Sequence, residues 1–443
     1  MSNTSFRKPD LAYVFERFPT FTQTFCVREI LELERQGLRP MLFSIRDTRD
    51  EPLEDHFPPD LISRVHFLPP EKELVAEVTR MKDADLLPQE VVLTLRHWGK
   101  APDKMRVYEA AYVGVKMREA GVWHAHSHFA GVGARCCWWL KKFYAMQFSF
   151  TGHANDIFED SGCAVSLEKL MAEASMVVTV SDYTAAFLNR KFPAEATKVK
   201  RVYNGLDLEP FERAKHVEKA RPSMLLSVGR LIEKKGFDDL VRACAMIREL
   251  GGADFRCVIV GDGPMEEKLL ALIAELEVGD LVQLVGPKSQ PEIVDLLGEA
   301  QIFVLPCVTE KNGGKDNLPT VIMEAMAAAL PCVSTRLAGV PEMVIEGETG
   351  LLVDERQPGD FAAAVASLLG DAERCRAMGT AGEQHARQAF AQVVTAGSLK
   401  QCFSQVGAFG MVGRLKNWLG KFTKLEVSEY ALADQEARKA AGK

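Results

Sequence analysis

Two carboxylates, Asp316 and Glu324, lie in the stretch "GGKDNLPTVIMEAMAAALPCV" with seven residues between them. Such a pair serves either as an acid and a base that cleave a glycosidic bond or as two anchors that hold a ligand. Pro319 suits the first position of a helix, so the sequence predicts a helix from about residue 319 to 329. Asp316 then lies in the preceding loop, and Glu324 lies roughly 7 to 8 Å along the helix axis from Pro319.

The predicted separation of these two carboxylates decides between the two interpretations. Retaining glycosidases hold their two carboxyl groups about 5 Å apart, and we expect a loop residue and a residue inside the helix to lie further apart. The sequence therefore favours anchoring. The helix N-terminus would face an anion, and the acids on either side would bind hydroxyl groups.

Two cations, Arg230 and Lys235, follow the apolar run "MLLSVG" and precede a predicted helix. Cations beside a helix N-terminus favour a diphosphate, because the helix dipole and the free amides add to the side-chain charge. The alternative is that both are ordinary solvated loop side chains.

The stretch "VIVGDGPMEEKL" imitates a dinucleotide-binding fingerprint. The imitation is imperfect, because Glu266 stands at the third glycine position and no ribose-binding acid ends the next strand. We therefore interpret Gly261 and Gly263 as a tight turn and not as part of a nicotinamide-dependent dehydrogenase.

Three histidines alternate along "VWHAHSHF", so in a strand His124, His126 and His128 share one face. That arrangement raises the alternative of a metal site. No acidic partner lies at a suitable spacing in the sequence, so we predict no metal. Instead, we expect His126 and His128 to pack or to contact an acceptor at the end of the strand.

Apolar β-branched runs alternate with helical stretches along the chain, which indicates α/β structure with parallel sheets covered on both faces. A polar segment near residues 206 to 222 separates two such series. We predict two doubly wound, Rossmann-like domains that place a cleft at the carboxyl ends of their strands. The predicted boundaries are 1–205 for the N-terminal domain, 206–222 for a hinge, 223–392 for the C-terminal domain and 393–443 for a C-terminal helical segment.

The net charge of −7 over 443 residues argues against a nucleic-acid-binding surface. The ten scattered cysteines fit a reduced cytoplasmic compartment, and no apolar run is long enough to span a bilayer. Residues 411–425 form a basic amphipathic segment, which predicts either peripheral contact with an anionic membrane surface or a helix that returns to the N-terminal domain.

The segment "DNLPTVIMEAMAAALPCV", together with the "GR-x4-KG" spacing of Arg230 and Lys235, resembles retaining glycosyltransferases of family four. The resemblance implies the GT-B architecture of two facing Rossmann-like domains. It implies that Arg230 and Lys235 clamp the diphosphate of the donor, that Glu324 holds the ribose hydroxyls and that Asp316 holds the sugar hydroxyls. The sugar and phosphate end would meet the main chain of Asn317, Leu318, Pro319 and Thr320, where the residues other than Pro319 offer amide donors. Asp316 stands where many members carry Glu.

The N-terminal half resembles bacterial exopolysaccharide glycosyltransferases of the colanic-acid type. The resemblance rests on "HAHSHFAG", "FSFTGHANDIF", "VYNGLDLEPF" and "FPTFTQTFCVREI". By this resemblance, His153 lies near the reacting sugar and acts with Asp316 in catalysis. Gln23 replaces the usual Glu on the acceptor side, where we also expect His126 and His128.

The resemblance implies a retaining glycosyltransferase of cell-surface exopolysaccharide or lipopolysaccharide biosynthesis. The donor would be a UDP- or GDP-sugar, and the acceptor an oligosaccharide that is lipid-linked at the cytoplasmic membrane face. No metal ion or other cofactor is expected. The alternatives are an epimerase- or phosphorylase-like relative of the same architecture and a non-catalytic protein that only binds a nucleotide sugar.

Overall fold

The computed structural model describes residues 8–20, 23–51, 57–98, 103–158, 163–251 and 254–409. Contacts divide the chain into two compact units. Unit 1 comprises residues 1–152, 160–178 and 400–443, and unit 2 comprises residues 153–159 and 179–399.

The first sheet has seven strands in the order β3-β2-β1-β4-β5-β6-β7. Its strands are β1 (Leu11–Arg17), β2 (Pro40–Arg46), β3 (Val65–Phe67), β4 (His124–His128), β5 (Gln147–Gly152), β6 (Met176–Thr179) and β7 (Val199–Arg201). Strand β1 pairs in parallel with both β2 and β4. Strand order therefore reverses at β1, and in an open parallel sheet the carboxyl end of such a point is where ligands bind.

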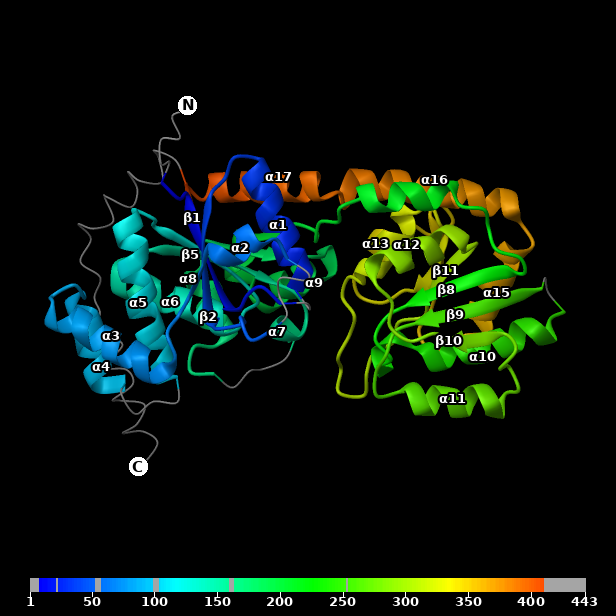
Figure 1. Ribbon diagram of the computed structural model, residues 1–443, viewed down its shortest axis with the longest axis horizontal. Helices are drawn as coiled ribbons and strands as arrows, with labels where there is room; N and C mark the ends of the chain where they lie inside the picture. Colours follow the sequence, from blue (N-terminus) through cyan, green and yellow to red (C-terminus); the bar gives the residue numbers. More distant parts are fainter. Residues whose placement is uncertain are drawn as a thin grey trace. The chain divides into compact units, whose positions relative to one another are not determined.

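The helices between these strands are α1 (Thr24–Arg35), α2 (Pro59–Ser63), α3 (Glu71–Asp83), α4 (Gln89–Trp98), α5 (Lys104–Ala120), α6 (Val132–Tyr144), α7 (Asn155–Phe158), α8 (Leu167–Glu173) and α9 (Asp182–Lys191). Helix α6 packs closely on the sheet because a Cβ at Gly133 would lie only 2.3 Å from Val14 O. Helices α3 and α4 lie beyond α5, on the outside of unit 1 (Figure 1).

The second sheet has six strands in the order β10-β9-β8-β11-β12-β13. Its strands are β8 (Ser223–Val228), β9 (Phe255–Val260), β10 (Val282–Leu284), β11 (Ile302–Leu305), β12 (Cys332–Thr335) and β13 (Gly350–Val353). The pairs of β8 with β9 and with β11 are parallel. Here the order reverses at β8, so β8 and β11 define the binding edge of this sheet.

Helices cover both faces of the second sheet, with α10 and α11 on one side and α12 and α13 on the other (Figure 1). The helices that follow β7 are α10 (Phe237–Glu249), α11 (Glu266–Glu275), α12 (Gln290–Glu299), α13 (Thr320–Ala327), α14 (Val340–Met343), α15 (Pro358–Leu369), α16 (Ala372–Ala389) and α17 (Gln392–Gln405), with short 3-10 turns at Pro193–Lys198, Glu209–His216 and Glu233–Lys235.

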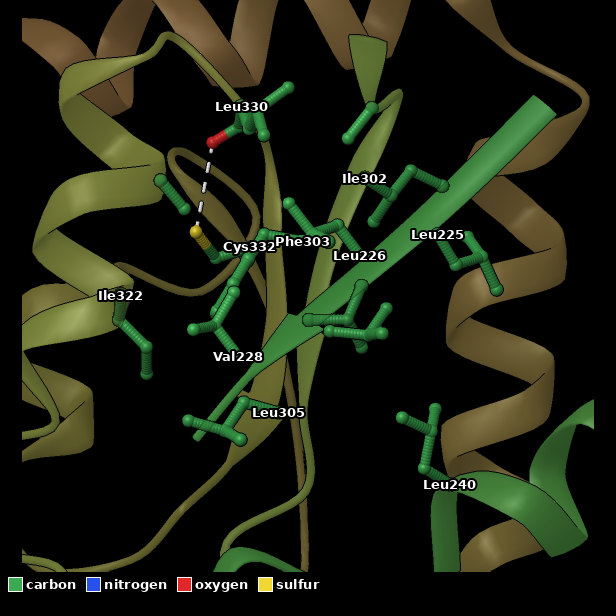
Figure 2. Close-up of a cluster of buried hydrophobic side chains, with 14 of the residues drawn as sticks. Leu225, Leu226, Val228, Leu240, Ile302, Phe303, Leu305, Ile322, Leu330 and Cys332 are labelled. Carbon is green, nitrogen blue, oxygen red and sulfur yellow. Dashed lines mark hydrogen bonds between the residues drawn. The ribbon is translucent and has the colours of Figure 1, made fainter. Parts of the chain in front are cut away.

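The core of unit 2 explains why its apolar runs fold as buried strands. Figure 2 shows Leu225 and Leu226 of β8 beside Ile302 and Phe303 of β11, with helices on either side of the strands. All four side chains have at most 1% exposure, so the strands are apolar on both faces, as in a covered parallel sheet. Removing one such side chain typically costs about 2 to 5 kcal/mol.

The prediction of two parallel-sheet, Rossmann-like α/β domains is confirmed. The sequence analysis did not identify β3 or β13, which have only three and four residues.

Contacts place two segments differently from the predicted domain boundaries. Residues 153–159 and 179–205 belong to unit 2, although they precede the predicted hinge. One cause is a side-chain network around Asn317, described below. Residues 400–409 belong to unit 1, where Phe403 packs edge-on against His126 with ring centroids 5.0 Å apart. The boundaries at 205, 222 and 392 stay predictions.

In the part of the chain that the structure describes, every helix is too short or too polar to cross a bilayer. The basic segment 411–425, predicted to contact a membrane, lies outside the described residues.

Candidate functional site

The loops that follow β8 and β11 carry the cation and the carboxylate that the sequence analysis selected in unit 2. Lys235 ends the short turn Glu233–Lys235 after β8, and Asp316 lies between β11 and α13. These two strands are neighbours at the point where strand order reverses. The sheet therefore positions both side chains at the edge where parallel sheets bind ligands.

Two glycines allow the Lys235 side chain to reach Asp316. Gly236 has φ +66°, and a Cβ there would lie 1.9 Å from Pro306 O, so the turn packs directly against the end of β11. A Cβ at Gly229 would lie 3.1 Å from Lys235 Cε, which shows that the lysine chain runs along Gly229. At its end, Lys235 Nζ contacts Asp316 Oδ2 in an ion pair.

Electrostatics keep both members of this pair charged. Burial alone would lower the pKa of Lys235, but Asp316 outweighs burial and, with a smaller contribution from Glu324, raises it. Burial alone would raise the pKa of Asp316, but the Lys235 ammonium outweighs it and lowers the pKa below its usual value. The two side chains keep 13% and 19% exposure, so the pair can still reach a ligand.

Helix α13 follows the Asp316 loop and begins at Thr320, with Pro319 as its N-cap. The predicted start at Pro319 was therefore one residue early, because Pro319 has ψ 107° and lies outside the helix. Glu324 is half-buried inside the helix, and Leu318 and Pro319 are buried before it. Of the first-turn amides, that of Ile322 donates to Pro319 O at 3.0 Å, and the N-terminus of the helix faces the same loop as Asp316.

Asn317 joins three loops of unit 2. Its Nδ2 donates to His153 O at 2.7 Å and to Thr184 Oγ1 at 2.9 Å. Its Oδ1 accepts from Ser181 Oγ at 2.8 Å. This network involves the segments that contacts assign to unit 2 ahead of the predicted hinge.

His153 follows β5, and its main chain is held on both sides. Its amide donates to the Asp156 carboxylate at 3.1 and 3.3 Å, and its carbonyl accepts from Asn317. Its side chain is nearly buried, at 9% exposure. The structure therefore links His153 to the residue next to Asp316, a connection that sequence spacing alone did not reveal.

Arg230 and the glycines of the dinucleotide-like stretch have different places in unit 2. Arg230 is exposed on the loop after β8. Gly261 and Gly263 have φ +139° and +152°, and a Cβ at either would lie within 3 Å of the β8 loop backbone. They therefore form a tight turn that packs against this loop, as the sequence analysis interpreted them.

In unit 1 the three histidines share one face of β4, as predicted. Tyr13 of β1 lies beside two of them, with ring centroids 5.0 Å from His126 and 6.0 Å from His128. His124 is buried, and burial lowers its pKa to about 3, so it stays neutral.

The sequence offered no acidic partner at a suitable local spacing, but the fold supplies one, because Glu29 of α1 contacts His128. Glu29 Oε1 lies 3.0 Å from His128 Nε2 and accepts from Tyr13 Oη at 2.7 Å. Burial alone would lower the pKa of His128, but Cys26 and Glu29 outweigh it and hold the pKa well above its usual value. Glu29 precedes His128 by 99 residues, so local spacing could not reveal the pair.

Glu29, His126 and His128 place one potential ligand atom each within 4.8 Å of one another, a set of types that suits a divalent ion. The same atoms also have hydrogen-bond partners. His126 Nδ1 lies 2.8 Å from Ser149 Oγ, and its Nε2 lies 3.1 Å from Thr151 Oγ1. The contacts therefore account for this cluster without requiring an ion.

Gln23, the third residue predicted on the acceptor side, precedes α1. Its Oε1 is buried and has no hydrogen-bond partner among the described residues. Among the described residues, Gln23 is thus the predicted acceptor-side residue whose side-chain oxygen lacks a hydrogen-bond partner.

This arrangement of two doubly wound parallel sheets is the GT-B fold of glycosyltransferases. The chain superposes on a glycosyltransferase from Rickettsia africae with a TM-score of 0.70, over 90% of this chain and 98% of that one, at 14% identity. At that identity the likeness shows the fold alone.

Residues 209–385 match the family model described as "Glycosyl transferases group 1", so the chain contains a domain of that family. This stretch includes the Lys235, Asp316 and Glu324 positions. The resemblance to family-four glycosyltransferases is thereby confirmed.

Curated relatives agree with the resemblance to the colanic-acid type. A putative colanic acid biosynthesis glycosyltransferase, WcaL of Escherichia coli, is 36% identical over 42% of this chain and 46% of its own length. An amylovoran biosynthesis glycosyltransferase, AmsK of Erwinia amylovora, is 27% identical over 81% of this chain and 89% of its own length. The chain thus aligns with about half the length of the first of these relatives and with most of the second.

Proposed function

We propose that this protein is a retaining glycosyltransferase of cell-surface polysaccharide biosynthesis. It transfers a sugar from a nucleoside-diphospho-sugar to a saccharide acceptor that is lipid-linked at the cytoplasmic membrane face. The single observation that carries the proposal is the Lys235–Asp316 pair, held at the carboxyl edge of the second sheet and directly before helix α13.

The chemistry of this edge fits a nucleoside-diphospho-sugar. Lys235 is a point charge for a phosphate, and Arg230 adds a second cation on the same loop. Helix α13 directs its first amides at the same edge, which adds a partial positive charge. The carboxylates of Asp316 and Glu324 accept hydrogen bonds from sugar and ribose hydroxyls. One edge thus offers donors to the diphosphate and acceptors to the hydroxyls.

The proposed transfer depends on stabilising the leaving diphosphate. As the bond between the anomeric carbon and the diphosphate oxygen breaks, negative charge grows on that oxygen, and Lys235, Arg230 and the α13 amides stabilise it. The acceptor hydroxyl attacks the anomeric carbon on the same face and gives its proton to the departing diphosphate oxygen, so the anomeric configuration is kept. No metal ion is proposed for this step, because the side chains and amides supply the positive charge.

His153 and the acceptor side complete the proposal. His153 would contact the reacting sugar, where its imidazole positions a sugar hydroxyl. Of the residues expected on the acceptor side in unit 1, Gln23 would contribute to acceptor recognition, and the buried His126 and His128 would serve chiefly in packing.

Ligand-dependent thermal stabilisation tests the proposal first. The wild type and Glu324→Ala would be heated with UDP, GDP, ADP, CMP and NAD in turn. A ligand at 100 times its Kd adds about 2.7 kcal/mol to the free energy of unfolding. We expect one nucleoside diphosphate to stabilise the wild type and to lose most of that effect in Glu324→Ala. Stabilisation by NAD alone would contradict the proposal.

A second measurement separates transfer from mere binding. His153→Ala should still be stabilised by the nucleoside diphosphate but should transfer sugar far more slowly than the wild type. An unchanged rate would refute the role of His153. Release of a changed or free sugar without any acceptor product would instead indicate an epimerase- or phosphorylase-like activity.

A further inference from the structure

We propose that Asn317 is a positioning residue for the transfer: its carboxamide fixes the main chain of His153 relative to the loop that carries Asp316. This inference rests on the proposed function. It differs from the sequence-based prediction, which placed Asn317 among the residues that contact the donor.

The carboxamide of Asn317 is fully engaged inside unit 2. An asparagine side chain has two N–H donors and one acceptor oxygen. The donors reach His153 O and Thr184 Oγ1, and the oxygen accepts from Ser181 Oγ. The side chain is also buried, with the residue at 4% exposure. No N–H of this carboxamide is left for a ligand, so its side chain acts through other residues.

The main chain of Asn317 is fixed as well. Its carbonyl accepts from Gly339 N at 2.9 Å, and a Cβ at Gly339 would lie 2.6 Å from that carbonyl oxygen. The main-chain carbonyl and the side-chain carboxamide of Asn317 are therefore both held by close contacts. Because its main chain and its side chain are both fixed, Asn317 can hold the main chain of His153 at a set position relative to the loop that carries Asp316.

The two loops that Asn317 joins are those that the proposed transfer uses. Asp316, its neighbour in the chain, contacts Lys235. His153 has its amide bound to Asp156 and its carbonyl bound to Asn317, so the peptide groups on both sides of its Cα are fixed. Fixing both peptide groups restricts the direction in which the His153 side chain leaves the main chain.

The substitution Asn317→Asp tests this role with minimal change in shape. A carboxylate at this position would present an oxygen to His153 O, and two acceptors facing each other repel. A protonated carboxyl group could again donate to that carbonyl. Burial and the facing carbonyl should raise the pKa of the introduced carboxyl well above the usual Asp value of about 3.9. Lowering the pH should therefore restore the interaction.

We expect kcat of Asn317→Asp to fall about 100-fold at pH 8, a typical cost of misplacing a catalytic group by about 1 Å. The Kd for the nucleoside diphosphate should change less than about twofold, because Lys235 and Glu324 are intact. As the pH falls from 8 to 5.5, the ratio of variant to wild-type kcat should rise. Asn317→Ala should lose kcat without recovering at low pH.

Thr184→Val is the matched control, because it removes one partner of the carboxamide and leaves the bond to His153. Its kcat should stay within about threefold of the wild-type value, since the hydrogen bond from Asn317 to His153 O is intact. A merely structural role for Asn317 would instead lower thermal stability in all three variants and produce no pH-dependent recovery.

The outcomes separate this inference from the proposed function. If the wild type transfers sugar and Asn317→Asp matches it at every pH, the inference alone fails. If the wild type acts on no nucleotide sugar, the proposed function fails. NMR then decides the structural part of the inference, with His153→Gln used to assign the imidazole resonances. Unchanged His153 resonances in Asn317→Asp would overturn it, and shifted resonances that return at low pH would support it.

Discussion

Each sheet carries a polar cluster where its strand order reverses, and the two clusters differ in how their charges are satisfied. In unit 1, His128 ends β4 and pairs with Glu29. In unit 2, Lys235 pairs with Asp316 in the loops after β8 and β11. The same place in the same topology thus holds a buried imidazole in one unit and a partly exposed ammonium in the other.

The burial of the charged groups separates a packing role from a ligand-binding role. The His128 side chain has no exposure, and Tyr13 Oη donates a further hydrogen bond to its partner Glu29. Lys235 keeps 13% exposure and pairs with Asp316, which lies in the loop before the N-terminus of α13. The unit 1 pair should therefore contribute mainly to stability, and the unit 2 pair mainly to ligand binding.

Lys235→Ala should give the largest effect and tests the unit 2 half of this comparison. It removes a phosphate-binding cation and leaves the Asp316 carboxylate unpaired near the donor diphosphate. We expect kcat/KM to fall about 1000-fold, which corresponds to roughly 4 kcal/mol. Nucleoside diphosphate stabilisation should also be lost.

Lys234→Ala is the control for that experiment. Lys234 adjoins Lys235 in the same turn, but the ion pair with Asp316 comes from Lys235. Its removal should cost kcat/KM less than about tenfold, since it changes the local charge equally without breaking the pair. Equal losses in the two variants would show that general positive charge, and not the placed ammonium, binds the donor.

Glu29→Gln tests the unit 1 half through stability. Removing one member of a buried pair costs about 3 to 5 kcal/mol, and because Glu29 is 20% exposed we expect about 2 to 3 kcal/mol. Thermal unfolding at pH 6 would measure this loss. Glu16→Gln, which breaks the exposed pair with Arg46, is the control and should cost at most about 1 kcal/mol.

The loss of stability in Glu29→Gln should also depend on pH. The pKa of His128 is raised in the folded protein, while the unfolded value is about 6.5. Its pair with Glu29 therefore contributes fully below about pH 6.5, and the contribution is lost as the pH rises through the raised folded pKa. The difference in stability between wild type and Glu29→Gln should thus be largest at pH 6 and shrink above that folded pKa. A difference that grows with pH would contradict the assignment of charge.

The sequence predicted those features of the two sheets that depend on local residue patterns. The apolar runs predicted most strands, and the alternation of the histidines placed them on one face of β4. The strands β3 and β13 were missed. The pairing of His128 with Glu29 and the network around Asn317 join residues 99 and 164 positions apart, a distance that only tertiary packing closes.

Glu324→Gln tests whether the half-buried acid of α13 belongs to the ligand-binding cluster. The amide keeps the shape but offers one acceptor oxygen in place of two, so one ribose hydroxyl would lose a charged partner. We expect donor affinity to fall about tenfold, or roughly 1.4 kcal/mol, with little change in kcat. Calorimetric titration with the nucleoside diphosphate would measure it. Glu348→Gln, an exposed acid of unit 2, is the control and should bind like the wild type.

Asp316→Glu should give the smallest effect, and it tests whether the length of the acidic side chain in the unit 2 pair matters. The added methylene keeps the carboxylate, and the flexible Lys235 chain along Gly229 can shift to maintain the ion pair. We therefore expect donor KM and kcat to change no more than about threefold, since volume changes at a partly exposed site cost little. Steady-state kinetics with the preferred donor would measure this. A loss of 100-fold or more would mean that the length of the Asp316 side chain selects the sugar hydroxyl. The Lys235–Asp316 pair would then tolerate as little change in geometry as we expect of the buried His128–Glu29 pair.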